Sequence, residues 1–265
     1  MTENSARQQF RDLHQRGSFI IPNPYDVGSA RLLEAMGFAA LATTSAGFAW
    51  SLGRPDMGVT RSELVNHVAA ITSSIQVPLN VDAERCFADD LDGVKQTVGL
   101  LADAGASGIS IEDWNPATNS IDSLSSAAAR VEAAALAAHK HGVLLTARAE
   151  NHIHGVTDFD DTVIRLRAYR EAGADVLFAP GIATKEQIDA VVAIGLPINI
   201  MLTATPLSIP ELSDLGVRRV SVGGSLATFA HGALVAAAQQ LLDVGRFSPT
   251  NRRTADDLMR RAFRH

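Results

Sequence analysis

Two carboxylates follow one apolar stretch of the chain. In PLNVDAERCF, residues 78–87, Leu79 and Val81 alternate with their neighbours as in a buried strand, and Asp82 and Glu84 come where that stretch ends. Two acids on the same side of an extended backbone repel each other unless a cation or a proton lies between them. The pair therefore indicates a site that holds one or the other.

Residues suited to a polar site also follow other apolar stretches. They are Asn23, Tyr25, Asp26, Thr43, Thr44, Ser45, Gly47, Glu112, Asp113, Arg148, Glu150, Asn151 and Asn199. Acidic oxygens without a His/Cys cluster favour Mg²⁺ or Mn²⁺ over zinc. Mg²⁺ keeps several waters, so Asp82 suffices as a direct ligand while Glu84 and Glu112 hold its waters. Arg148 offers a planar fork to an anionic substrate, a carboxylate or a phosphonate. A network of ion pairs without metal is the alternative.

A recurring unit predicts the fold that brings these residues together. Helical patterns end at a glycine and are followed by short apolar runs, as at Gly37, Gly105, Gly173, Gly195 and Gly216. Such runs are typical of parallel strands covered on both faces. Eight strands are predicted, at residues 19–22, 39–44, 78–82, 107–112, 143–148, 175–179, 197–201 and 218–222. Eight strands alternating with helices in a chain of this length favour an α/β fold, a (β/α)₈ TIM-type barrel that forms a single domain over residues 1–265. The site of such a barrel lies at the carboxyl ends of its strands. A doubly wound open sheet is the rival, but the first strand lacks a Gly-rich fingerprint.

Composition narrows the class of protein. The chain has 265 residues and a net charge of −6 without a basic cluster, which argues against nucleic acid or an anionic membrane surface as a partner. Cys86 is the only cysteine, so no disulfide framework exists and a reducing compartment fits best. The N-terminus lacks the apolar core of a secretory signal, and no stretch is long and apolar enough to span a membrane. A cytoplasmic location is expected.

Seven motifs in order resemble those of the isocitrate lyase/phosphoenolpyruvate mutase superfamily, in its methylisocitrate lyase-like or carboxyvinyl-carboxyphosphonate phosphorylmutase-like branch. They are TTSAGFAWSLGRPD, NVDAE, SIEDW, TARAENHIHG, GADVLFAPG, PINIML and GVRRVSVGGSLA. The resemblance implies a barrel that forms a homo-tetramer or dimer, often with a C-terminal helix swapped between subunits. It also implies Mg²⁺ and the enolate of a 2-oxo acid.

The resemblance assigns roles to individual residues. The metal set it implies is Asp82, Glu84, Glu112 and, through water, Asp56, and the substrate-binding residues it implies are Ser45, Ala46, Gly47, Arg148 and Asn199. The position of Tyr25 at the end of the first strand adds it to the substrate-binding set. Arg148, Glu150, His152 and Asn119 form the catalytic set. His152 and His154 alternate, so only one of them points inward if the strand continues past Arg148.

The loop after the fourth strand departs from the family pattern. Residues 113–123 read DWNPATNSIDS and lack the Cys and His of the isocitrate lyase loop, while Thr118, Asn119 and Ser120 match the phosphonate-enzyme pattern without its lysine. Its turn-forming residues predict a mobile lid that brings Asn119 or Ser120 toward the enolate. The proton donor must then lie elsewhere, at His152, Glu150, Tyr25 or a metal-bound water. Cys86 is predicted to be a core residue.

Three functions are compatible with these residues. The leading interpretation is a Mg²⁺-dependent lyase or decarboxylase that acts on a 2-oxo acid or a 2-hydroxy di- or tricarboxylate through a pyruvate-like enolate. A phosphonate P–C bond mutase or hydrolase is the alternative, and a non-catalytic barrel that binds a small diacid is the third. The sequence does not specify the substrate or the bond that is cleaved.

Overall fold

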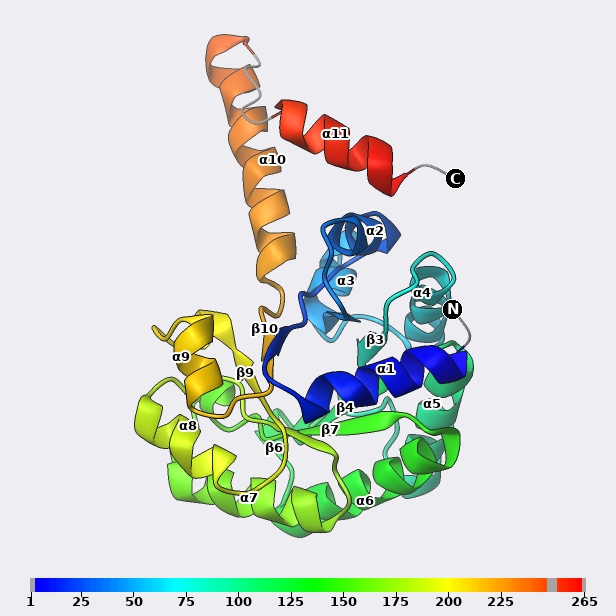
Figure 1. Ribbon diagram of the computed structural model, residues 1–265, viewed down its shortest axis with the longest axis vertical. Helices are drawn as coiled ribbons and strands as arrows, with labels where there is room; N and C mark the ends of the chain where they lie inside the picture. The colour runs from blue at the N-terminus through cyan, green and yellow to red at the C-terminus, as the bar shows by residue number, and fades with distance from the viewer. Residues whose placement is uncertain (1–2, 247–251, 264–265) are drawn as a thin grey trace.

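Eight parallel strands curl into a TIM-type barrel, as predicted (Figure 1). The structure is a computed structural model that describes residues 3–246 and 252–263. The strands are β1 (Phe19–Ile20), β2 (Leu41–Ala42), β3 (Leu79–Asp82), β4 (Gly108–Glu112), β7 (Leu144–Arg148), β8 (Val176–Phe178), β9 (Ile198–Met201) and β10 (Arg219–Ser221). They neighbour one another in the order β1-β10-β9-β8-β7-β4-β3-β2. Each lies within its predicted range, although β1 and β2 are much shorter than expected.

The two ends of the sheet meet beyond β1 and β2. The Ala42 N–H donates to the carbonyl oxygen of Pro22 at 3.0 Å. The Asn23 side-chain amide donates to the carbonyl oxygen of Thr43, also at 3.0 Å. These bonds join the residues that follow β1 to β2, which closes the ring and rules out the open-sheet rival.

Helices follow most of the strands and surround the barrel. They are α1 (Glu3–Gln15), α2 (Val27–Ala35), α3 (Ser45–Ser51), α4 (Arg61–Thr72), α5 (Leu91–Asp103), α6 (Leu124–His141), α7 (Phe159–Glu171), α8 (Lys185–Val192), α9 (Ile209–Asp214), α10 (Ser225–Val244) and α11 (Arg252–Ala262), with the 3-10 turns η1 (His152–His154) and η2 (Leu202–Ala204). Many begin at a Ser, Thr or Asp side chain that accepts an N–H of the first turn; Thr60 and Asp90 are examples. The five glycines predicted to end helices all have φ between 88° and 97°.

Alternation along the strands separates an apolar outer shell from a polar interior. Outward residues such as Val81, Ile109 and Leu177 join the main hydrophobic cluster with the helices. Their neighbours in sequence, including Asn80 and Ser110, line a cavity inside the barrel. The alternation along the strands therefore places the polar side chains inside the barrel.

Helix α1 packs against the strands from below the cavity. Phe10 is fully buried with Ile21, Ala42 and Leu144. A side chain at Gly108 would come within 2.5 Å of the Phe10 ring, so only glycine permits this close approach. The contact seals the barrel at the end opposite the expected site.

The loop after β4 has regular structure that the sequence did not predict. Its residues form an antiparallel hairpin of β5 (Trp114–Asn115) and β6 (Ser120–Ile121). The Trp114 ring stacks on the imidazole of His154, with centroids 3.5 Å apart and planes 4° apart. Asp122 beyond the hairpin accepts a bond from Arg85 Nε at 2.9 Å. The predicted lid is thus a small hairpin that contacts two neighbouring loops.

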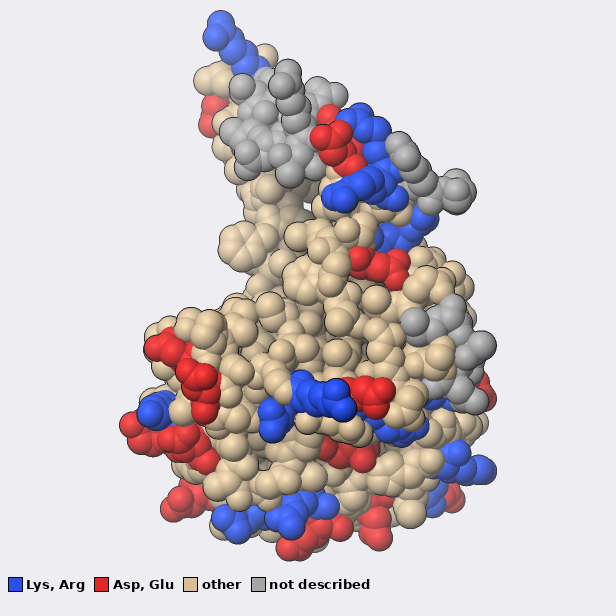
Figure 2. All heavy atoms as spheres, in the orientation of Figure 1, with Lys and Arg blue, Asp and Glu red and all other residues tan. Residues whose placement is uncertain are grey.

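The C-terminal helices extend beyond the barrel. Helix α10 projects away from it, and α11 folds back beside α2, where the Arg31 guanidinium lies 5.9 Å from the centroid of the Phe263 ring (Figure 1). Exposed apolar side chains lie along α10, namely Phe229, Leu234, Val235, Leu241, Leu242 and Val244. In Figure 2 charged side chains of both signs cluster on the lower helices, whereas the lower part of α10 carries few. Despite this apolar surface, none of the helices in the described ranges meets the length and hydropathy needed to span a bilayer.

Candidate active site

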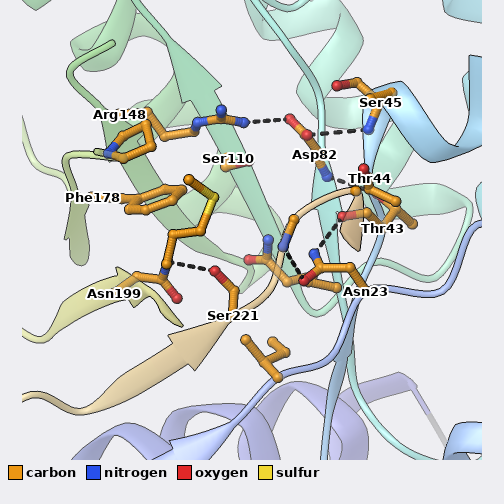
Figure 3. Close-up of a pocket in the computed structure, with 18 of the residues that line it drawn as sticks. Asn23, Thr43, Thr44, Ser45, Asp82, Ser110, Arg148, Phe178, Asn199 and Ser221 are labelled. Carbon is orange, nitrogen blue, oxygen red and sulfur yellow. Dashed lines mark hydrogen bonds and ion pairs between the residues drawn. The ribbon is translucent and has the colours of Figure 1, made fainter. Parts of the chain in front are cut away.

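A cavity of about 170 Å³ opens at the carboxyl ends of the strands. Its lining includes Asn23, Thr43, Thr44, Ser45, Ala46, Asp56, Asn80, Asp82, Ser110, Arg148, Phe178, Asn199, Arg219 and Ser221 (Figure 3). This is the rim at which the sequence placed its polar residues. The cavity combines carboxylate, guanidinium, amide and hydroxyl groups in one small volume.

Arg148 lies at the centre of the charged groups. Its Nη1 is 2.8 Å from Asp82 Oδ1 and 3.3 Å from Glu112 Oε2, and its Nε is 2.8 Å from Glu150 Oε1. The guanidinium carbon lies 5.3 Å from the centroid of the Phe178 ring (Figure 3). Burial alone would lower the pKa of Arg148, but the three carboxylates raise it well above its ordinary value. The third nitrogen, Nη2, makes no hydrogen bond with the described residues and is free for a ligand.

Asp82 is held at the end of β3 by its backbone neighbours. Its N–H donates to Thr43 Oγ1 at 2.8 Å, and its Oδ2 accepts the N–H of Ser45 at 3.2 Å. Ser45 is the first residue of α3, so the positive end of that helix faces this carboxylate. Asp82 therefore presents a fixed negative charge to the cavity between Arg148 and the start of α3.

Glu84 lies near this group but does not line the main cavity. It lines a neighbouring pocket with Met57, Arg85 and Asn115, and its Oε1 is buried without a hydrogen-bond partner in the described part of the chain. Burial, followed by the charges of Asp82 and Asp56, raises the pKa of Glu84 to about 8. A buried acid with an unsatisfied oxygen beside two further acids is the arrangement that a cation would relieve.

Two further acids complete the charged layer. Burial raises the pKa of Glu112 well above its usual range, against the opposing effect of Arg148. It also raises the pKa of Glu150 to about 7. Asp113, by contrast, points away and accepts bonds from Tyr169 Oη at 2.6 Å and Arg165 Nη1 at 3.2 Å. Asp113 therefore fastens the end of β4 to α7.

The donor set can be tested against a hard divalent cation. Across residues 3–246 and 252–263, no three His, Cys, Asp or Glu side chains are arranged to hold one ion together. Arg148 Nη1 contacts both Asp82 and Glu112. Mg²⁺ needs only one or two direct carboxylates and keeps its waters. Asp82 as the direct carboxylate, with the unsatisfied oxygen of Glu84 accepting from a water of the ion, fits that requirement. Asp56 is exposed at the mouth of the cavity, where its Oδ1 accepts the Met57 N–H at 2.9 Å.

The residues expected to bind substrate are divided between the cavity and its surroundings. Ser45 and Ala46 line the wall, and Asn199 lines the floor. Gly47 is buried within α3, where an added Cβ would lie 2.9 Å from Tyr25 Cβ. Tyr25 itself is outside the lining, with its ring 6.3 Å from that of His231. Gly47 and Tyr25 thus support the wall from behind.

Several candidate catalytic residues lie outside the lining. The backbone turns into η1 after Asn151 instead of continuing β7, and His152 Nε2 lies 3.3 Å from Thr162 Oγ1 on α7. Ile153, not either histidine, reaches the cavity. Asn119 is exposed at the hairpin tip with φ 51°. The catalytic roles of His152 and Asn119 remain predictions.

Cys86 is a core residue, as expected. It is fully buried in the main hydrophobic cluster, and burial raises the pKa of its thiol to about 12. Both Cys86 and the following Phe87 have positive φ, 62° and 52°. Residues other than glycine adopt this left-handed backbone only at some energetic cost.

Four polar cavity residues were absent from the predicted site. They are Asn80, Ser110, Arg219 and Ser221, which line the cavity from β3, β4 and β10. Their only sequence signature is a polar residue that alternates with apolar ones, in LNVD, GISIE and RVS. That alternation marks an interior-facing set once a closed barrel is established.

An α/β barrel with a cluster of acids around an arginine at its carboxyl rim defines a class of enzyme-like active site. The phosphoenolpyruvate phosphomutase family profile matches residues 10–242. The chain belongs to this family, and hence to the isocitrate lyase/phosphoenolpyruvate mutase superfamily.

Similar proteins carry several activities. The chain is 30% identical over 252 residues to the oxaloacetate decarboxylase of Bradyrhizobium sp. strain BTAi1, covering 92% of this chain and 85% of that protein. A Burkholderia cenocepacia J2315 structure, named only as a lyase/mutase, superposes with a TM-score of 0.91 at 44% identity and covers 96% of each chain. The structure of 2,3-dimethylmalate lyase superposes with a TM-score of 0.83 at 26% identity, covering 98% of this chain and 94% of that one.

Proposed function

We propose that the protein is a Mg²⁺-dependent lyase or decarboxylase that acts on a 2-oxo acid or a 2-hydroxy di- or tricarboxylate through a pyruvate-like enolate. The observation that carries this proposal is the pairing of Asp82 with Arg148 at the mouth of the cavity, at 2.8 Å. Asp82 supplies an anchor for a cation, and the free Nη2 of Arg148 supplies a donor for a carboxylate. The names of the similar decarboxylase and lyase support the same class.

The cation would be held by Asp82 directly, with Glu84, Glu112 and Asp56 reaching it through water. When bound, it would supply Lewis-acid stabilisation of negative charge on the C2 oxygen of the substrate.

The chain's own residues orient the substrate and balance its charge. The Nη2 of Arg148 donates to a substrate carboxylate, and Glu112 and Glu150 keep the guanidinium fixed from behind. For a 2-oxo acid, the C3–C4 bond breaks with loss of CO₂, its electron pair forms the C2=C3 bond as the C2 carbonyl becomes the enolate oxygen, and water supplies the proton that adds at C3. For a 2-hydroxy diacid, the hydroxyl proton passes to water as C2=O forms, the C2–C3 bond breaks, the carboxylate on C3 takes up the electron pair, and a proton from water adds at C3. Glu150 is fully enclosed, so it acts on the cavity only through Arg148.

The test is a panel of substrates with and without divalent metal. Oxaloacetate, methylisocitrate, dimethylmalate and phosphonopyruvate are each incubated with the protein in Mg²⁺, in Mn²⁺ and in a chelator, and products are identified by NMR. The proposal requires metal-dependent formation of pyruvate or another 2-oxo acid from one of the first three. Activity unaffected by the chelator would contradict the metal assignment.

Phosphonate chemistry is a second candidate. It is favoured by the family profile, named for a phosphomutase, and by the Thr118, Asn119 and Ser120 pattern on the hairpin. Thr118 Oγ1 and Ser120 Oγ are 2.9 Å apart, so the two hydroxyls face one another at the tip. Turnover of phosphonopyruvate alone in the same panel would select this candidate.

We also propose that the protein works as a homo-oligomer that binds a small carboxylate. The exposed apolar side chains of α10, such as Phe229 at 77% and Leu242 at 82% exposure, support association with another copy. Sedimentation should give a dimer or tetramer, and Phe229→Asp with Leu242→Asp should shift the protein toward monomer. A monomeric parent would contradict this part of the proposal.

A further inference from the structure

A second guanidinium lies at the floor of the cavity and forms no ion pair with the rim acids in the part of the chain that the structure describes. Arg219 is 3% exposed and lines the cavity from the first residue of β10. Its Nε donates to Asn199 Oδ1 at 2.9 Å and its Nη2 donates to Thr146 Oγ1 at 2.9 Å. Its Nη1 lies 3.4 Å from His14 Nε2. Each of these partners is a neutral group.

Arg219 has no carboxylate to balance its charge. Within the described residues it forms no ion pair, whereas Arg148 has three acidic partners and Arg165 has two. Burial lowers the pKa of Arg219 to about 9, so the side chain is still charged at neutral pH. A buried charge without a counter-ion is costly unless an anion joins it. Because Arg219 borders a cavity, that anion can come from a ligand.

The residue below Arg219 is arranged as an acceptor. His14 Nδ1 lies 2.8 Å from the Phe10 carbonyl oxygen, so Nδ1 carries the proton and Nε2 is left to accept from Arg219. Burial, together with the charge of Arg219, lowers the pKa of His14 to about 3. His14 therefore fixes the guanidinium from beneath and adds no charge.

The residues around the floor offer further polar groups. Asn199 accepts from Arg219 with Oδ1, which turns its Nδ2 toward Ser221 Oγ at 2.9 Å (Figure 3). Since Ser221 Oγ accepts that bond, its own O–H is available to donate. Asn80 is 5% exposed and lines the cavity, and its Oδ1 is buried without a hydrogen-bond partner in the part of the chain that the structure describes. An unpartnered buried oxygen points to a water or ligand donor in the cavity, and Nδ2 is the atom of this amide that can donate to a carboxylate.

We propose that this floor, formed by Arg219, Asn199, Ser221 and Asn80, binds the distal carboxylate of a diacid substrate. The inference rests on the proposed function, which places the reacting carbons beside Arg148 at the rim. A substrate that spans the cavity then meets one guanidinium at each end, Nη2 of Arg148 above and Arg219 below. Arg219 is thereby the residue that selects a dianion over a monoanion.

This placement also narrows the reaction. A carboxylate that leaves as CO₂ loses its charge in the transition state, so an arginine paired with it would stabilise the substrate more than the transition state. When the C2–C3 bond of a 2-hydroxy diacid breaks, the distal carboxylate stays on the departing fragment and takes up the electron pair as an enediolate, so its negative charge grows in the transition state. The floor therefore favours C–C cleavage of a 2-hydroxy diacid over loss of the distal carboxylate as CO₂.

The test compares two ligands that differ only in the distal carboxylate. Malate and 2-hydroxybutyrate are titrated into the full-length protein in Mg²⁺ by calorimetry, for the parent and for Arg219→Met, Arg219→Lys and Arg7→Met. Arg7 is the matched control, because it is also a buried arginine but donates to the carbonyls of Ala102 and Ala106 outside the cavity.

We expect the parent to prefer malate by about 10-fold or more, since bonds to charged groups are the strong ones. Arg219→Met should remove most of this preference, Arg219→Lys should retain part of it, and Arg7→Met should leave it unchanged. If Arg219→Met does not fold, Asn80→Leu and Ser221→Ala are measured instead. Each should weaken the binding of malate by about 3-fold or more and leave the binding of 2-hydroxybutyrate unchanged.

An unchanged malate preference in these variants, or a parent that does not prefer malate, would overturn the inference. Binding is measured without turnover, so it is judged separately from the proposed function. If the preference for malate depends on Arg219 but the protein turns over no member of the substrate panel, the floor site is supported and the proposed reaction is contradicted. If turnover depends on metal but Arg219 has no role in malate binding, the proposed reaction is supported and the floor site is contradicted.

Discussion

Replacing Asp82 by Asn removes one charge from the cavity and leaves the shape of the side chain almost unchanged. If the amide oxygen accepts the Ser45 N–H, which is 3.2 Å from Asp82 Oδ2 in the parent, the amide nitrogen replaces Oδ1 and no longer accepts from Arg148 Nη1. Breaking an isolated buried ion pair costs about 3–5 kcal/mol. Here Arg148 keeps Glu112 at 3.3 Å and Glu150 at 2.8 Å, and Glu84 loses a repelling neighbour. We therefore expect the free energy of unfolding of the metal-free variant to lie within about 1 kcal/mol of that of the metal-free parent.

Mg²⁺ should stabilise the parent protein but not the Asp82→Asn variant. A ligand at about 100 times its Kd adds about 2.7 kcal/mol to the free energy of unfolding. In a chain of this size 1 kcal/mol shifts the Tm by roughly 2–4 °C, so Mg²⁺ should raise the parent Tm by about 5–10 °C. Without the Asp82 charge the increase should fall below about 2 °C, and turnover should be lost.

The assay is thermal unfolding followed by circular dichroism, in a chelator and in saturating Mg²⁺. Asp122→Asn is the matched control, because Asp122 is similarly buried and pairs with Arg85 at 2.9 Å outside the cavity. This control should keep the Mg²⁺-dependent increase. If Asp82→Asn keeps both the increase and the turnover, the cation is not held by Asp82. If the free energy of unfolding of the metal-free variant falls by more than about 3 kcal/mol, Glu112 and Glu150 do not balance the charge of Arg148.

Three further substitutions test other parts of the protein. Arg148→Lys has one nitrogen in place of separate donors to Asp82 and Glu150, so calorimetry should show oxalate binding weakened by about 10-fold or more, and unchanged binding would assign Arg148 to the carboxylate network alone. Cys86→Ser should keep most of the turnover, because the thiol is buried and protonated; a loss of about 10³-fold in kcat would contradict this. Burial lowers the pKa of His67 from 6.5 to about 4, so its contribution to stability is complete above pH 6.5 and is lost as the pH falls toward 4. Urea unfolding of His67→Gln should show a flatter pH dependence by up to about 3 kcal/mol over that range, and a slope equal to that of the parent would exclude His67 as its source.

The sequence by itself predicted the barrel and the composition of its rim. Short, continuous apolar runs and helix-ending glycines are local patterns, so the eight strands and the positions of Asp82, Glu112 and Arg148 could be derived without coordinates. The register of β4 with β7 then places Glu112 beside Arg148, as their strand ends implied.

Only the tertiary structure decided which groups meet. Arg219 and Asn80 are 139 positions apart in the chain, and nothing local distinguishes them from ordinary polar strand residues. The direction of His152 was likewise undetermined, since it depends on whether the chain turns into η1 after Asn151. Strand patterns fix the face on which a side chain lies, but its partners follow from the closure of the ring and the packing of α1 beneath it. Charge balance at a buried site is a property of those non-local neighbours, and the sequence alone does not contain it.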